Sequence, residues 1–206
     1  MKNKAVITGD ITQFTNLSPE KRQTLVQETE AYLQEGLTPT EAAATFRGDS
    51  YQVLMDTPER ALRKSIQLIS WFRKRKDTPG GLGTRISIGI GSISYKGETV
   101  LNSDGPAFHR SGRNFDLMED QTYLAITTAD EGKNENIAVI LNFVNKYIDK
   151  WSPLQAEVVY LHLEGLNQVT IARELAISQP SVNSRLRSAG WREIEPAIHY
   201  IISIIN

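Results

Sequence analysis

Residues Arg85 to Ile93 carry the pattern that most restricts how this chain can fold. Every second residue is isoleucine and the residues between are small: Ile86, Ile88 and Ile90 alternate with Ser87, Gly89 and Gly91. A period of two is typical of a β-strand with one buried face. The two glycines leave the other face almost bare, so another group can approach the sheet closely. A nucleotide base, a partner sheet or a covering helix would each satisfy the pattern.

The segments around this strand predict alternating strands and helices. A hydroxyl residue followed by proline and glutamate marks the start of two helices, at Ser18 to about Glu35 and Thr57 to about Lys76. Further strands are expected at Lys4–Gly9, Ala42–Arg47, Tyr51–Met55 and Tyr123–Thr127, and a further helix at Gly105–Met118. The order β-α-β-β-α-β-α-β contains a ferredoxin-like arrangement. We therefore expect an α+β, ferredoxin-like domain, followed by an all-α domain.

A polar run, Ala129 to Asn136, marks the predicted domain boundary because almost none of its residues can form a core. We predict an α+β domain at 1–130, a linker helix at 131–150 and a helical domain at 151–206. The amphipathic segment Ile137–Ile148 within the linker could lead into the last domain or pair with its copy in a dimer.

The stretch Gln168–Arg187 fits a helix-turn-helix motif. Apolar residues stand where the motif needs a core, and Ala172 is small where two helices must approach closely. Ser178 can cap a second helix, whose polar side chains would contact DNA: Gln179, Ser181, Asn183, Ser184, Arg185 and Arg187. The segment from Trp151 onward is not basic overall, so a helix-turn-helix used for packing or protein contact is the alternative.

The wider stretch SPLQAEVVYLHLEGLNQVTIARELAISQPSVNSRL resembles the DNA-binding domains of LuxR-type regulators and of sigma-factor region 4. The resemblance implies a module that lays its second helix in the major groove of duplex DNA. Ala176 departs from it, because glycine is the usual residue at this turn. Alanine can follow the same backbone at a modest cost.

Two aspartates stand next to predicted strand ends: Asp10 follows the first strand, and Asp49 lies in a turn between two strands. The predicted topology brings both to one end of the sheet. Two carboxylates there suit Mg²⁺ or Mn²⁺ with a nucleoside triphosphate, since these ions take carboxylate and phosphate oxygens. The candidate phosphate ligands are Arg47, His109, Arg110 and Arg113. The alternative is that each aspartate is an ordinary turn residue.

Three motifs around these residues resemble those of class III nucleotidyl cyclases: GDITQFT, RGDS and GPAFHRSGR. The resemblance implies that Asp10 and Asp49 bind metal and that Arg113 contacts the transition-state phosphates. It also implies a homodimer, because these cyclases share the site between two copies. Thr45 and His109 stand where the cyclases have a base-selecting lysine and an asparagine. The combined pattern ITGDI, FRGDSYQ, RISIGIGS and SDGPAFHRSGR is also similar to the bacterial SatD family, whose members pair such a domain with a C-terminal helix-turn-helix.

Composition narrows the functional classes in three ways. The chain has no cysteine, which excludes disulfides, thiolate catalysis and cysteine-bound zinc. Its formal net charge is −1, so any charge that attracts DNA must be local. An N-terminus without an apolar leader, and the lack of a long apolar stretch, predict a cytoplasmic protein without membrane contact.

The first interpretation is a DNA-binding transcription regulator without catalytic activity. Its cyclase-like domain would bind a nucleotide or phosphate ligand with Mg²⁺ or Mn²⁺, and its partners would be double-stranded DNA and a second copy. The alternative is an active nucleotidyl cyclase or nucleotidyltransferase with an accessory helix-turn-helix. A third interpretation is an interaction scaffold with neither activity. The sequence leaves open whether Ile194–Asn206 is a further helix of the last domain or a dimer contact.

Overall fold

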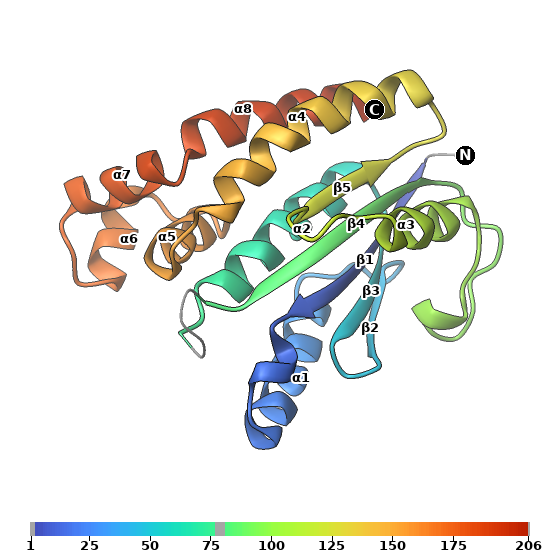
Figure 1. Ribbon diagram of the computed structural model, residues 1–206, viewed down its shortest axis with the longest axis horizontal. Coiled ribbons are helices and arrows are strands. Elements are labelled where there is room, and N and C mark those ends of the chain that lie inside the picture. Colours follow the sequence, from blue (N-terminus) through green and yellow to red (C-terminus); the bar gives the residue numbers. More distant parts are fainter. Residues whose placement is uncertain (1–2, 77–80, 206) are drawn as a thin grey trace.

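A five-stranded sheet forms the centre of the first part of the chain in the computed structural model, which describes residues 3–76 and 81–205 (Figure 1). The strand order is β2-β3-β1-β4-β5. The strands are β1 (Lys4–Thr12), β2 (Ala42–Phe46), β3 (Ser50–Met55), β4 (Gly83–Gly91) and β5 (Leu124–Thr127). β1 runs antiparallel to β3 and β4, β2 runs antiparallel to β3, and β5 runs parallel to β4. The first four strands therefore have the predicted ferredoxin-like order, and β5 extends the sheet beside β4.

Two helices, α1 (Pro19–Gln34) and α2 (Pro58–Arg73), cover one face of the sheet. Both begin as the sequence predicts, with a hydroxyl side chain at the N-cap and proline at the first position. Alternate residues of β1 and β4 point into the core under these helices, among them Ile7, Ile86 and Ile88. The period-two pattern of the strands thus determines which side chains face α1 and α2.

The opposite face of the sheet is covered by α3 (Pro106–Asp116). A Cβ atom built on Gly89 would lie 2.1 Å from the carbonyl oxygen of Ala107 and 2.3 Å from the amide nitrogen of Ser111. The group that approaches the bare face of β4 is therefore a covering helix. Val6 and Leu54 complete a small core between α3 and the sheet.

Five helices make up the rest of the chain: α4 (Glu131–Asp149), α5 (Pro153–Leu163), α6 (Gln168–Glu174), α7 (Gln179–Ser188) and α8 (Trp191–Ile205). Helices α5 and α8 pack on α2, α4 packs on β5, and α6 and α7 pack on α5. Helices α4 and α8 lie side by side along one edge of the molecule (Figure 1). The hydrophobic core runs without a break from the sheet through α2 into these helices, across the boundary predicted at residue 130. The final segment, left open by the sequence, is a helix that packs along α4.

Helices α6 and α7 are joined by residues 175–178, and Ala176 has the left-handed backbone (φ 52°) usually taken by glycine at such a turn. Ser178 caps α7 by accepting a hydrogen bond from the Ser181 amide. Within the described residues, no helix combines the length and apolarity that crossing a membrane requires.

Candidate active site

Asp10 lies near the end of β1, on the sheet face that α3 covers, and its carboxylate pairs with Arg85 of β4. The guanidinium Nη2 is 2.8 Å from Oδ2 and Nε is 3.3 Å from Oδ1, so both carboxylate oxygens are engaged. The hydrogen bond with Asp10 raises the pKa of Arg85 further, so this guanidinium is charged. Its cationic plane lies 5.4 Å from the ring centre of Phe115 on α3.

Arg85 was not among the predicted site residues, although its place in the alternating pattern of β4 is visible in the sequence. Arg85 has the same parity as Ser87 and Gly89, which places it on the bare face of β4. Strand pairing puts it directly opposite Asp10. The sequence does not reveal the register in which β1 and β4 pair. It therefore could not show that Arg85 is the residue opposite Asp10.

Asp49 lies at the tip of the β2–β3 hairpin, and the hairpin is fastened to the end of β1. Arg47 and Gly48 both have positive φ (55° and 88°), the backbone that a tight hairpin turn needs. The amide of Ile11 donates a 2.8 Å hydrogen bond to the carbonyl oxygen of Asp49. Asp10 in turn pairs across the ladder with Ser50. The two aspartates therefore belong to adjacent segments at one end of the sheet, which we call the Asp10–Asp49 corner.

The four predicted phosphate ligands do not gather in one place. Arg47 is exposed at the hairpin, next to Asp49. His109 Nε2 lies 2.7 Å from Asp104 Oδ1 near the start of α3. Arg110 donates a 2.9 Å hydrogen bond to the carbonyl of Ile90, at the other end of β4.

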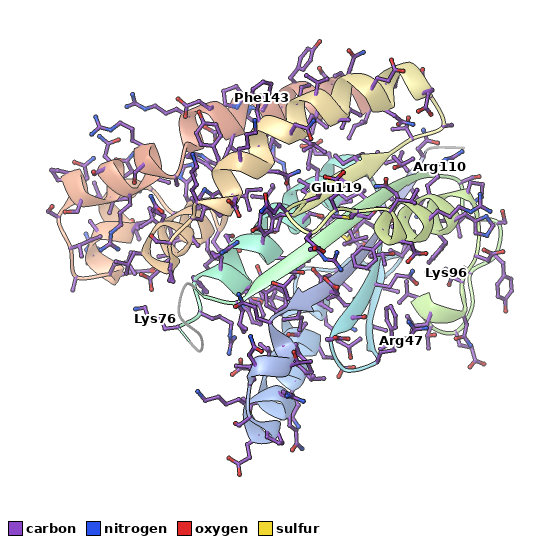
Figure 2. The ribbon with its side chains drawn as sticks, viewed as in Figure 1. Arg47, Lys76, Lys96, Arg110, Glu119 and Phe143 are labelled. Carbon is purple, nitrogen blue, oxygen red and sulfur yellow. The ribbon has the colours of Figure 1, made fainter. Side chains whose placement is uncertain are left out.

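Figure 2 labels Arg47 and Arg110 well apart, on the hairpin and on α3. Ile90 is five residue steps along β4 from Arg85, which corresponds to about 17 Å at roughly 3.3 Å per residue. Arg113 is exposed on α3, one turn closer to the aspartates than Arg110. The sequence could not place these residues because it does not give the direction in which α3 crosses the sheet.

The donor set at this corner fits a divalent cation that is held partly by its substrate. Mg²⁺ is commonly bound by one or two carboxylates together with substrate phosphates, and Asp10 and Asp49 can supply the carboxylates. The described residues contain no cluster of three or more histidine, cysteine or acidic side chains that could hold a metal. The binding of a cation by these two carboxylates stays a prediction, and Arg85 already occupies both oxygens of Asp10.

The side chains predicted to contact DNA lie on α7, and several already have protein partners. Gln179 donates to Gln168 at 2.8 Å, and the hydroxyls of Ser181 and Ser178 are 2.8 Å apart. Arg185 lies 4.0 Å from Glu157 of α5. Of the remaining three, Asn183 is half-buried, and Ser184 and Arg187 are exposed. Their contact with DNA stays a prediction.

Several solved structures are similar in fold to part of this chain. No protein-family model and no curated protein matches the sequence. Among solved structures, the active GGEEF domain of a diguanylate cyclase from Vibrio cholerae is 11% identical, with a TM-score of 0.45 over 63% of this chain and 84% of that chain. A sensory box/GGDEF family protein from Caulobacter crescentus is 20% identical, with a TM-score of 0.39 over 57% and 81%. The GGDEF domain of YfiN from Pseudomonas aeruginosa is 18% identical, with a TM-score of 0.41 over 63% and 83%.

These findings correct the first interpretation of the sequence. The structures returned are GGDEF or GGEEF domains, and none of the three is described as a DNA-binding transcription regulator, so that interpretation is not retained. The assignment of the fold rests on strand order and direction, which give an α+β domain with a ferredoxin-like arrangement.

Proposed function

We propose that this chain is a nucleotidyltransferase of the cyclase type, which acts on a nucleoside triphosphate at the Asp10–Asp49 corner. The observation that carries the proposal is the hydrogen bond between the Ile11 amide and the Asp49 carbonyl. This bond holds the turn that bears one carboxylate against the end of the strand that bears the other. Convergence of two acids from separate segments is the arrangement that metal-assisted phosphoryl chemistry needs.

Each residue at the corner has a defined part in this proposal. Asp10 and Asp49 hold Mg²⁺ or Mn²⁺, which when bound neutralises charge on the triphosphate and on the leaving group. Arg47 is exposed beside Asp49 and can contact a phosphate in a bidentate manner. Arg85 keeps the Asp10 carboxylate in position until the substrate arrives, then swings to a phosphate oxygen.

The proposed reaction is a displacement at the α-phosphorus of the nucleoside triphosphate. A ribose hydroxyl oxygen forms a bond to the α-phosphorus, and the bond from that phosphorus to the bridging oxygen of the β-phosphate breaks. Pyrophosphate leaves with the bonding electron pair, and the hydroxyl proton passes to water.

Thr45, on β2, stands where the cyclases have their base-selecting lysine. The letters GGDEF and GGEEF do not occur in this sequence either. We therefore propose the class of reaction without specifying the nucleobase of the triphosphate.

Product analysis tests this proposal directly. The protein is incubated with each of the four nucleoside triphosphates and Mn²⁺, and products are identified by mass spectrometry. We expect one cyclic or linear nucleotidyl product together with pyrophosphate. Asp10→Asn and Asp49→Asn should each abolish it, whereas Glu98→Gln, at an exposed acid in the loop between β4 and α3, should leave it unchanged. No product with any triphosphate, or equal product from the Asp10→Asn protein, would refute the proposal.

A further inference from the structure

One helix face is conspicuously apolar and uncovered. On α4, Val139, Phe143 and Tyr147 follow one another at intervals of four residues, which aligns them on one side of the helix. Phe143 is 62% exposed and Val139 is 60% exposed. On the neighbouring helix α8, Tyr200 is 60% exposed and stands one turn after Ala197. We call these five residues the α4–α8 face.

A groove runs beside the protruding side chain of Phe143. Its volume is about 250 Å³, and it lies between α4 and α8 with Ile140, Val144 and Ile194 among its lining residues. Glu193 is the one charged residue in the lining. In Figure 2, Phe143 projects from the outer side of α4, away from the sheet. The Lys146 ammonium group lies 5.8 Å from the centre of the Phe143 ring, and most of the ring is still exposed. Such an apolar stripe is typical of an interaction site.

We infer that the α4–α8 face binds a second copy of this chain, with the two α4 helices antiparallel. The face is self-complementary, because it has both a protruding ring and a groove of matching apolar character beside it. A two-fold axis near Phe143 would let each ring enter the groove of the other copy, the isologous contact of a C₂ dimer. This inference does not depend on the proposed reaction.

The charges along α4 favour a second copy in this orientation. Glu135 lies eight residues before Phe143, and Lys150 lies seven residues after it; both are exposed. The first turns of α4 carry Glu131, Lys133 and Glu135, and its end carries Lys146, Asp149 and Lys150. The first end is therefore net acidic and the second net basic, so an antiparallel pair brings opposite net charges together and a parallel pair brings like net charges together. The formal net charge of −1 adds little overall repulsion between copies.

The size of the face sets the expected strength. A fully buried aromatic side chain removes roughly 150–250 Å² from water, so the exposed parts of Phe143 and Tyr200 represent on the order of 100 Å² each. A stable complex buries about 800 Å² per partner. The apolar residues would thus form the centre of an interface completed by a polar rim that includes Lys146. We expect a dissociation constant in the micromolar range.

Sedimentation equilibrium tests the inference, with protein from about 1 to 300 µM, a range that brackets micromolar dissociation constants. The unmodified chain should be dimeric at the upper end. Phe143→Glu should weaken the dimer at least about thirtyfold, as expected for a central anchor. Leu117→Glu, at an 81% exposed leucine that ends α3, should have no effect. Circular dichroism confirms that each variant is folded.

A charge-reversal series tests the orientation and protects the result against misfolding of the Phe143 variant. Glu135→Lys and Lys150→Glu should each weaken the dimer severalfold, and the double variant should restore it. A monomer at all concentrations, a dimer that survives Phe143→Glu, or reversals without effect would each overturn the inference. A complex with a different protein that excludes self-association would also overturn it.

Discussion

Substituting Gly89 with alanine tests how closely α3 lies on the sheet. The new Cβ would be 2.1 Å from the Ala107 carbonyl oxygen and 2.3 Å from the Ser111 amide nitrogen. Both are main-chain atoms of α3, so no side chain can rotate away to make room. Ordinary contact begins at 3.4 Å. The helix must therefore move outward by about 1.3 Å, the difference between 3.4 and 2.1 Å.

The expected loss follows from what this movement opens. Phe108 and Ala107 of α3 pack against Val6 and Leu54 of the sheet, and an outward shift separates them. Overpacking typically costs 1–3 kcal/mol, and we expect about 3 kcal/mol here because the obstruction is main chain. For a chain of this length each kcal/mol corresponds to about 2–4 °C, so Tm should fall by roughly 6–12 °C.

Urea unfolding followed by circular dichroism measures this loss, with Gly112→Ala as the matched control. Gly112 lies in the same helix, and a Cβ there meets no heavy atom within 4 Å. Alanine should therefore stabilise the chain by about 0.5–1 kcal/mol, since glycine is unfavourable inside a helix. The reasoning is refuted if the free energy of unfolding of the Gly89→Ala protein lies within about 0.5 kcal/mol of the unmodified chain.

Three further predictions concern other parts of the chain. Tyr51→Phe should destabilise the protein by about 1 kcal/mol in urea unfolding, because the buried hydroxyl bonds to the Thr84 hydroxyl, which would keep only its bond to the Asp10 carbonyl. Burial opposes ionisation of Asp56, but hydrogen bonds, first of all from Lys4, outweigh burial and hold its pKa at about 2. The ionised Asp56 carboxylate therefore stabilises the fold fully above pH 3.8, its ordinary pKa, and this contribution is lost as pH falls towards 2. When the free energy of unfolding is measured by urea at several pH values, it should fall less steeply between pH 3.8 and 2 in Asp56→Asn than in the unmodified chain. Arg85→Gln should tighten Mn²⁺ binding to Asp10 by about tenfold in electron paramagnetic resonance titrations, since a charged hydrogen bond of about 1.5 kcal/mol no longer competes; unchanged or weaker binding would contradict the role given to this ion pair.

The local rules of strand and helix formation were sufficient for much of the first part of the chain. Alternation from Ile86 to Gly91 identified a strand with one close-packed face, and the capping residues Ser18 and Thr57 placed two helix starts correctly. These features depend on residues near one another in sequence, where periodicity and capping act directly. The identity of the group on the bare face remained open, because a glycine pattern shows that something is close without showing what it is.

Long-range packing accounts for what the sequence did not reveal at the site. Asp10 and Asp49 could be placed at one corner from topology, but the pairing of Asp10 with Arg85 depends on strand register. The separation of Arg110 from the aspartates depends on the direction of α3. Register and helix direction are determined by tertiary contacts, so single-sequence patterns do not carry them.

Tertiary packing also explains why the sequence did not reveal that the sheet and the later helices share one hydrophobic core. Helix α2 contacts both β4 of the sheet and α5 of the later helices. Its buried residues Leu68, Ile69 and Phe72 belong to one cluster with buried residues of the sheet and of those helices. The polar run at 129–136 still looked like a domain boundary because it forms the exposed start of α4. A polar segment shows where the chain meets solvent, and it does not show whether two cores are separate.

Anomalous scattering from crystals grown with Mn²⁺ and a non-hydrolysable nucleoside triphosphate tests most directly whether the Asp10–Asp49 corner is an active site. We expect a manganese peak within about 2.0–2.6 Å of carboxylate oxygens from both aspartates and of a phosphate oxygen, with Arg85 moved from Asp10. Manganese found only elsewhere, with the ion pair between Arg85 and Asp10 intact in the presence of nucleotide, would contradict it.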